Sequence, residues 1–187
     1  LQAAQAARIE TDAPLHVDAL LLEVRAMFFA GQAPGSWPLL EQALALARAH
    51  GYARGEYNAM SQMGLLRWQA GSYDAAEERL GQALRLIEVA GDARPQIDIL
   101  NNLGVVAKAR SRHAQAVGHY EQAQRLARRI GDRPGEGMLL INMSSASLAA
   151  GDFLQAGRFA EQAQGIFVEV NEPVKQALAE ATGSVDA

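Results

Sequence analysis

The sequence predicts an all-helical protein made of repeated helix pairs, and three observations support this prediction. First, apolar residues make up 49% of the 187 residues, and most of them are Ala and Leu, which favour helix over sheet. Second, the tetrapeptides EQAL, GQAL, EQAQ and EQAQ recur at a fixed spacing, at 41–44, 81–84, 121–124 and 161–164. Third, residues that end helices recur at the same spacing. Such a period indicates stacked copies of one supersecondary unit.

The expected helix ends follow from residues that accept the left-handed conformation. They stand at Gly31, Gly51, Gly71, Gly91, Ser111, Gly131, Gly151 and Asn171. Residues typical of helix starts follow several of these positions: Asp92, Asp132 and Asp152, with Ser72 in the same role. Pro14, Pro95 and Pro134 are expected in first turns, where the missing N–H is harmless. Each unit therefore consists of two helices of roughly seventeen residues joined by tight turns.

These boundaries divide the chain into four units flanked by half units. Residues 1–11 match the second helix of a unit, because Gln2, Ala3, Ala7 and Arg8 align with Gln42, Ala43, Ala47 and Arg48. The four complete repeats are expected at 12–51, 52–91, 92–131 and 132–171. The stretch EPVKQALAEA begins a further first helix within 172–187. We therefore expect the chain to be a segment of a longer protein.

Small and large apolar residues also recur within the units. In the first helices Met63, Leu103 and Met143 align, and each is followed by a small residue, at Gly64, Gly104 and Ser144. In the second helices Leu40, Leu80, Tyr120 and Ala160 align, as do Ala43, Ala83, Ala123 and Ala163. Small residues let helices approach closely, and one pair alone cannot bury its apolar stripe. Glu23 breaks the pattern, which predicts irregular packing in the first unit.

The large–large–small pattern of the first helix, followed by Ala, a bulky residue and Ala, resembles the tetratricopeptide repeat. The stretch NNLGVVAKARSRHAQAVGHYEQAQRLARRIGDRPGEG carries the resemblance most fully. HEAT and armadillo units have a similar length, but the Gly and Ala positions favour the tetratricopeptide repeat. The forty-residue form is similar to kinesin light chains and to the sensor arms of bacterial transcription regulators. The resemblance implies a right-handed α-solenoid of antiparallel helix pairs.

Composition argues against several classes of function. The formal net charge is −4, so the Lys and Arg excess of a nucleic-acid or anionic-membrane binder is missing. No apolar run approaches the length of a membrane-spanning helix. Because there are no cysteines, a disulfide framework, a thiolate metal site and a cysteine nucleophile are all impossible. We expect a cytoplasmic protein without cofactor or metal, bound to neither nucleic acid nor membrane.

No catalytic constellation emerges, and we expect a protein that is not an enzyme. His113 stands where neighbouring units have Tyr73 and Phe153, which favours a packing role. Ser144 stands where packing requires a small residue. An arginine cluster follows in RLARRIGDR, at Arg125, Arg128, Arg129 and Arg133. Interaction with a helix C-terminus is the favoured interpretation, and binding of an anion or partner is the alternative.

The resemblance implies a binding groove lined by the first helices of the units. Carried onto this chain, it places Gln62, Asn102 and Asn142 at one recurring position. Carboxamides both donate and accept, so they can bind the backbone of an extended peptide. Aromatic residues at the other end are expected to anchor it. The predicted partner-binding residues are Arg25, Phe28, Asn58, Gln62, Trp68, Asn101, Asn102, Lys108 and Asn142.

The predicted function is a protein-binding or peptide-binding module that holds an extended peptide or a partner helix in this groove. By resemblance, the module is the sensor or scaffold part of a larger intracellular regulator. Self-association of two chains is one alternative. A regulatory domain of a multidomain enzyme is another, and in that case too the active site lies outside this chain.

Overall fold

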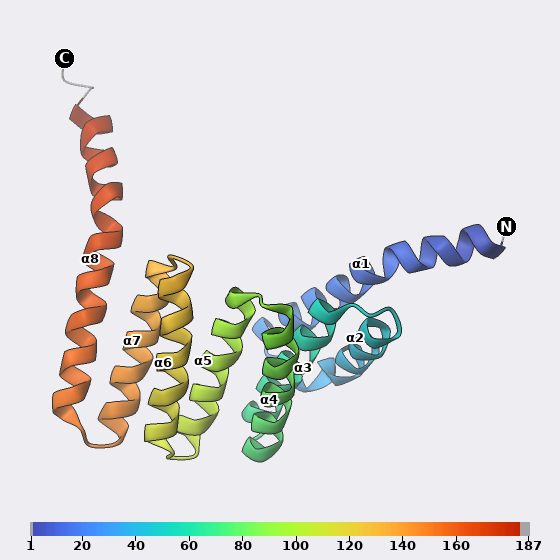
Figure 1. Cartoon of the computed structure of the whole chain (residues 1–187), viewed down its shortest axis with the longest axis horizontal. Coiled ribbons are helices and arrows are strands. Elements are labelled where there is room, and N and C mark those ends of the chain that lie inside the picture. The colour runs from blue at the N-terminus through green and yellow to red at the C-terminus, as the bar shows by residue number, and fades with distance from the viewer. Residues whose placement is uncertain (1, 184–187) are drawn as a thin grey trace. The chain divides into compact units, whose positions relative to one another are not determined.

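The structure, a computed structural model, describes the backbone of residues 2–183 and the side chains of residues 12–33 and 35–171 (Figure 1). The prediction of an all-α fold is confirmed, with the helices packed as sequential antiparallel pairs. In chain order the elements are α1 (Gln2–Phe29), the short 3-10 helix η1 (Ala33–Ser36), α2 (Trp37–Ala49), α3 (Ala53–Gln69), α4 (Tyr73–Ala90), α5 (Ala93–Ala109), α6 (His113–Arg129), α7 (Arg133–Ala149) and α8 (Phe153–Gly183).

The chain forms two compact units. Unit 1 covers Leu1–Val106 and contains α1 to α4 with most of α5. Within it, α2 contacts α1 and α3, and α3 contacts α4. Unit 2 covers Ala107–Ala187, and in it α7 contacts both α6 and α8. These helix pairs, which are neighbours in sequence, are therefore neighbours in space.

The predicted turn positions are confirmed with one exception. The six predicted glycines have positive φ angles between 62° and 81°, and Ser111 has a φ of 59° in the same role. The aspartates also act as expected: Asp132 accepts a hydrogen bond from the Gly135 backbone N–H at 3.0 Å. Ser72 occupies a helix start but makes no capping bond through its side chain. Asn171 is the exception, because it lies inside α8.

The helices at the two ends of the chain are longer than expected. No turn separates residues 11 and 12, since α1 is continuous from Gln2 to Phe29 and has Pro14 in its interior rather than in a first turn. No turn separates residues 171 and 172 either, since α8 continues to Gly183. Both junctions lack the glycine that closes the internal helices. Without a residue that readily adopts the left-handed conformation, the helix continues.

The small residues of the first helices allow close helix contacts, as predicted. A Cβ atom on Gly64 would lie 2.7 Å from Cγ of Leu80 and 3.3 Å from the carbonyl oxygen of Ala76. Ser144 occupies the same repeat position in unit 2, where Ala160 takes the place of Leu80. The Ser144 hydroxyl donates to the carbonyl oxygen of Ala156, which corresponds to Ala76, at 2.9 Å. A larger residue in α7 is therefore matched by a smaller one in α8.

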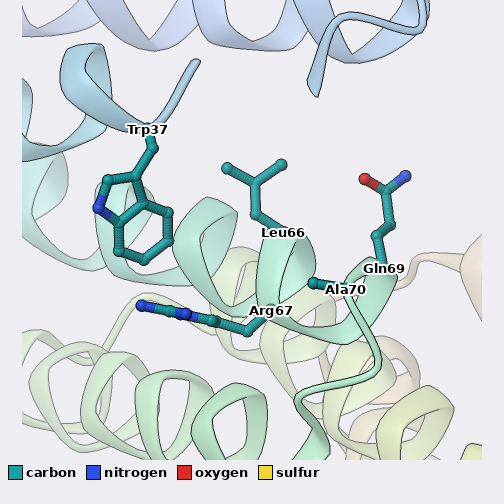
Figure 2. Close-up of a pocket in the computed structure, with 5 residues that line it drawn as sticks. All are labelled: Trp37, Leu66, Arg67, Gln69 and Ala70. Atoms are coloured by element: carbon teal, nitrogen blue, oxygen red, sulfur yellow. The ribbon is translucent and has the colours of Figure 1, made fainter. Parts of the chain in front are cut away.

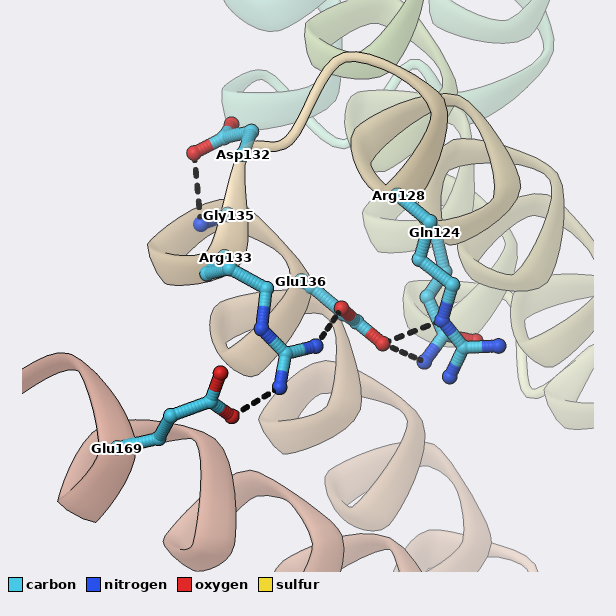
Figure 3. A network of polar contacts seen from close by, with 7 residues as sticks. All are labelled: Gln124, Arg128, Asp132, Arg133, Gly135, Glu136 and Glu169. Carbon is cyan, nitrogen blue, oxygen red and sulfur yellow. Dashed lines mark hydrogen bonds and ion pairs between the residues drawn. The ribbon is translucent and has the colours of Figure 1, made fainter.

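A buried carboxylate joins the helices of unit 2 (Figure 3). Glu136 is 1% exposed, at the start of α7, and one of its oxygens accepts from Arg128 and from Gln124 of α6. Its other oxygen accepts from Arg133, whose second guanidinium nitrogen binds Glu169 of α8. Arg128 and Arg129 lie in the last turn of α6, as the helix-end interpretation expected, and Arg128 and Arg133 are in addition ion-paired with the Glu136 carboxylate. Unit 1 repeats the contact, with Arg48 and Glu56 2.8 Å apart.

Tyr120 carries a buried hydroxyl that has no hydrogen-bond partner among the described residues, and its side chain is 0% exposed. Burial raises the pKa of Tyr120 to about 12. Tyr120 ionises more easily in the unfolded chain than in the folded one. Its ionisation therefore leaves the free energy of unfolding unchanged below about pH 10. As the pH rises from about 10 towards 12, ionisation in the unfolded chain lowers that free energy.

We expect Tyr120→Phe to keep or raise stability at pH 7 by up to about 1–3 kcal/mol, because it removes an unpaired buried hydroxyl. The variant should also lose part of the decline in stability above pH 10. Urea unfolding at pH 7, 10 and 11 measures both effects. A loss of more than 1 kcal/mol at pH 7 would show that the hydroxyl has a stabilising partner.

Candidate functional site

Unit 1 contains a groove of about 530 Å³ lined by residues of three first helices and the turn before the last of them. We call it the unit 1 groove. Helix α1 contributes Asp18, Leu21, Leu22 and Arg25, and helix α3 contributes Arg54, Tyr57, Asn58 and Gln62. The turn before α5 contributes Asp92, and the start of α5 contributes Arg94, Pro95 and Asp98. Three of the predicted binding residues, Arg25, Asn58 and Gln62, therefore lie together in one groove.

An ion pair fixes the wall between α1 and α3. Arg54 Nη2 lies 2.8 Å from Asp18 Oδ2, and Arg54 Nε donates to the Tyr52 hydroxyl at 2.7 Å. The Tyr52 hydroxyl donates in turn to the Asp18 carboxylate at 3.0 Å. Burial, the largest cause, raises the pKa of Tyr52, while the bond to Tyr52 raises the pKa of Arg54. This triad holds α1 against α3. The Asp18 carboxylate is therefore already bonded within the protein.

The carboxamides of Asn58 and Gln62 are available for a ligand. Both side chains are half-buried on α3 and line the groove. Among the residues that the structure describes, neither amide has a hydrogen-bond partner. Their spacing of four residues places them on the same face of the helix, one turn apart. The groove thus presents two adjacent groups that both donate and accept.

Charges and apolar surface surround these amides. Arg25 is exposed and has no ion-pair partner within the described part of the chain. Leu22 is 57% exposed beside it, whereas Tyr57 is 3% exposed and forms part of the groove wall. Asp92 and Asp98 stand at the α5 end of the groove. A bound segment would therefore meet polar, apolar and charged groups within one groove.

The other predicted binding residues lie outside the lining of this groove. Asn102 is half-buried on α5 of unit 1, while Asn101 and Asn142 are not free, since each already has an interaction within the protein. In unit 2, Lys108 donates to the Ser145 hydroxyl at 3.0 Å. Phe28 is half-buried against Phe29 in an edge-to-face contact, with ring centroids 6.1 Å apart.

A second pocket contains a tryptophan that the sequence analysis did not single out (Figure 2). It is lined by Trp37, Leu66, Arg67, Gln69 and Ala70 and has a volume of about 390 Å³. The Arg67 guanidinium carbon lies 4.4 Å from the centre of the Trp37 ring, and Trp37 Nε1 donates to Glu41 at 2.8 Å. The predicted anchor Trp68 is half-buried and does not line this pocket. The sequence did not indicate Trp37 because it starts a second helix, whereas the resemblance implied a groove lined by first helices.

The described residues hold no cluster of three or more His, Cys, Asp or Glu side chains suited to a metal ion. Within that same part of the chain, every helix is too short or too polar to cross a bilayer.

Comparison with known proteins identifies the family of the repeat. Residues 96–167 match the family model described as "Tetratricopeptide repeat". Residues 96–167 therefore consist of tetratricopeptide repeats. Such domains generally serve protein–protein interaction, and the matched family is typically not catalytic. No curated protein matches the sequence.

Solved structures similar to this chain share its fold at low identity. BtubC (BKLC) from P. vanneervenii is 20% identical with a TM-score of 0.77, over 86% of this chain and 66% of BtubC. Aspartyl phosphate phosphatase F from Bacillus subtilis is 13% identical with a TM-score of 0.77, over 83% of this chain and 41% of the phosphatase. A putative kinesin light chain with TPR-like repeats from Podosopora anserina is 17% identical with a TM-score of 0.66, over 83% of this chain and 77% of the kinesin light chain. The chain thus spans less than two thirds of the length of the first two.

Proposed function

We propose that the unit 1 groove binds an extended peptide segment of a partner protein. The observation that carries the proposal is the pair of carboxamides at Asn58 and Gln62, which line the groove without a partner among the described residues. An extended peptide offers unpaired backbone N–H and C=O groups, and each amide side chain can satisfy one of each. The amides would fix the peptide backbone, which gives affinity for many sequences.

The remaining lining residues would select side chains of the peptide. Leu22 gives an exposed apolar contact, and Arg25 is a cation available for an acidic side chain. Asp92, in the turn before α5, gives the opposite charge for a basic one. Asp18 and Arg54 already neutralise one another, so they would shape the groove more than select its ligand.

The proposal includes a parent protein larger than this chain, within the cytoplasm, in which the module acts as sensor or scaffold. The three similar solved structures are all longer than this chain, which supports that context.

The proposal predicts that peptides selected on this chain will depend on the two amides. A phage-displayed library of random twelve-residue peptides would be selected on the immobilised chain. We expect enriched peptides to bind the parent and to lose most of their signal on Asn58→Ala/Gln62→Ala. The matched control is Gln32→Ala/Gln42→Ala, which removes two exposed carboxamides of unit 1 outside the groove and should bind like the parent.

Circular dichroism must show the same helix content and the same melting temperature for all three proteins. A library that yields no peptide, or peptides bound equally by both double variants, would refute the assignment of the groove as the binding site.

A further inference from the structure

Three arginines line another groove of unit 1, which we call the arginine groove. It has a volume of about 430 Å³ and is formed by the second helices α2 and α4 together with the first half of α3. Its charged lining residues are Arg48 of α2, Glu56 of α3, and Arg79 and Arg85 of α4. Because three guanidinium groups accompany one carboxylate, the lining has an excess of two positive charges.

One of the three arginines has a carboxylate partner within the protein. Arg48 Nε lies 2.8 Å from Glu56 Oε1. Arg79 is half-buried, and its Nη1 donates to the neutral amide oxygen of Gln82 at 3.2 Å. Among the residues that the structure describes, neither Arg79 nor Arg85 has an ion-pair partner. Both cations are therefore available to an anion in the groove.

Two other carboxylates of α4, Glu78 and Glu88, do not line the groove. Glu78 accepts a hydrogen bond from Gln82 Nε2 at 3.1 Å, and Glu88 is exposed. In the described part of the chain, neither forms an ion pair with Arg79 or Arg85. The charge excess of the groove therefore persists in the folded protein.

The sequence also omits a carboxylate beside the groove. Gly81 of α4 stands where α2, α6 and α8 have a glutamate, at Glu41, Glu121 and Glu161. A Cβ atom on Gly81 would lie 3.7 Å from Nη1 of Arg85, four residues later, and this is an ordinary contact distance. Packing therefore does not require a glycine, which stabilises a helix less than glutamate does. Its effect is to leave Arg85 without a carboxylate one turn away.

Unit 2 has the corresponding ion pair, but its charges balance (Figure 3). The network there contains two arginines and two glutamates, which are Arg128, Arg133, Glu136 and Glu169. In α8 the places of the two unpaired arginines are taken by Phe159 and Gly165. The excess charge is therefore particular to the arginine groove and does not follow from the repeat.

We propose that the arginine groove binds a dianionic phosphate group. A phosphate monoester carries a charge of about −1.5 to −2 at pH 7, which matches the excess of two positive charges, whereas one carboxylate would neutralise half of it. Guanidinium groups present forked N–H donors that fit phosphate oxygens and form strong, charge-assisted hydrogen bonds. The half-buried Leu86 lines the same groove and would contact an organic group attached to the phosphate.

Isothermal titration with phenyl phosphate tests this site, and Gly81→Glu is the decisive variant. It restores the glutamate of the other repeats without removing a side chain, and it places a carboxylate beside Arg85. We expect phenyl phosphate to bind the parent and to bind Gly81→Glu roughly tenfold or more weakly. Arg79→Gln/Arg85→Gln should show a similar loss, because it removes both unpaired cations.

The matched control is Gly157→Glu, which adds the same charge at an exposed helical glycine of α8, where a Cβ atom would meet nothing within 4 Å. It should bind phenyl phosphate like the parent. Circular dichroism must show the same helix content for all variants. Absence of binding at millimolar phenyl phosphate, or equal binding by Gly81→Glu and Gly157→Glu, would overturn the proposal.

Three further probes identify the anion. Inorganic phosphate that binds as tightly as phenyl phosphate would support a free phosphate ion as the ligand, and weaker binding would support a phosphate ester. Benzoate, with a single charge, should bind more weakly than phenyl phosphate. Isophthalate that binds as tightly as phenyl phosphate would overturn the phosphate assignment in favour of paired carboxylates. The arginine groove shares no lining residue with the unit 1 groove, so these outcomes are independent of peptide binding there.

Discussion

Replacing both Arg128 and Arg133 with alanine is expected to lower the free energy of unfolding by about 3–5 kcal/mol. The two guanidinium groups are the cations that neutralise Glu136, which is 1% exposed. Without them the neutral amide of Gln124 still bonds this buried carboxylate, whose ion pairs are lost. Urea unfolding followed by circular dichroism measures the loss.

The matched control is Arg125→Ala/Arg129→Ala. It removes the same charge from the same helix, but both side chains are exposed and have no ion-pair partner among the described residues. It should cost less than about 1 kcal/mol. Adding Glu136→Leu to the first double variant should recover much of the lost stability, because it removes the unpaired charge. Equal losses in the two double variants would contradict the role given to Glu136.

The match between Gly64 and Leu80 predicts a strong coupling between the two positions. Gly64→Ser alone should cost about 1–3 kcal/mol, because its side chain would collide with Leu80. Leu80→Ala alone should cost about 2–5 kcal/mol, because Leu80 is fully buried. The double variant recreates the pairing of Ser144 with Ala160 in unit 2, where the serine donates to a backbone carbonyl.

We therefore expect the double variant to lose about 1–3 kcal/mol less unfolding free energy than the two single variants lose together. A double-mutant cycle measured by urea unfolding gives this coupling energy. If the losses were additive, the close contact between α3 and α4 would not couple the sizes of the residues at positions 64 and 80.

The repeat predicted most of the fold because its turns depend on single residues. A glycine that adopts positive φ is visible in the sequence, and so is an aspartate that caps the next helix. The ends were predicted less well. Asn171 tolerates the left-handed conformation but does not require it, and the sequence could not show that the helix would continue through it.

The pair of Arg128 and Glu136 was missed for a different reason. Its counterpart is Arg48 with Glu56, two repeats away, and the repeat between them has Glu88 and Gln96 at these positions. A comparison of adjacent repeats therefore hides the pattern, whereas a comparison of alternate repeats shows it. The charges alone suggested a helix-end effect, because the sequence does not tell which carboxylate lies within reach.

The candidate site was predicted in part. Repeat position placed Asn58, Gln62 and Arg25 in one groove, since residues at equivalent positions of stacked helices face the same way. The bonds between Tyr52, Asp18 and Arg54 could not be predicted. Tyr52 lies in a turn, and its contact with a residue more than thirty positions earlier depends on how closely α1 and α3 pack.

The most direct test of peptide binding in the unit 1 groove is isothermal titration of one selected peptide into the parent and into Asn58→Ala/Gln62→Ala. Each amide that bonds the peptide backbone contributes about 0.5–1.5 kcal/mol, so the double variant should bind roughly tenfold or more weakly. The same dissociation constant for both proteins would contradict the account and place the binding surface elsewhere on the chain.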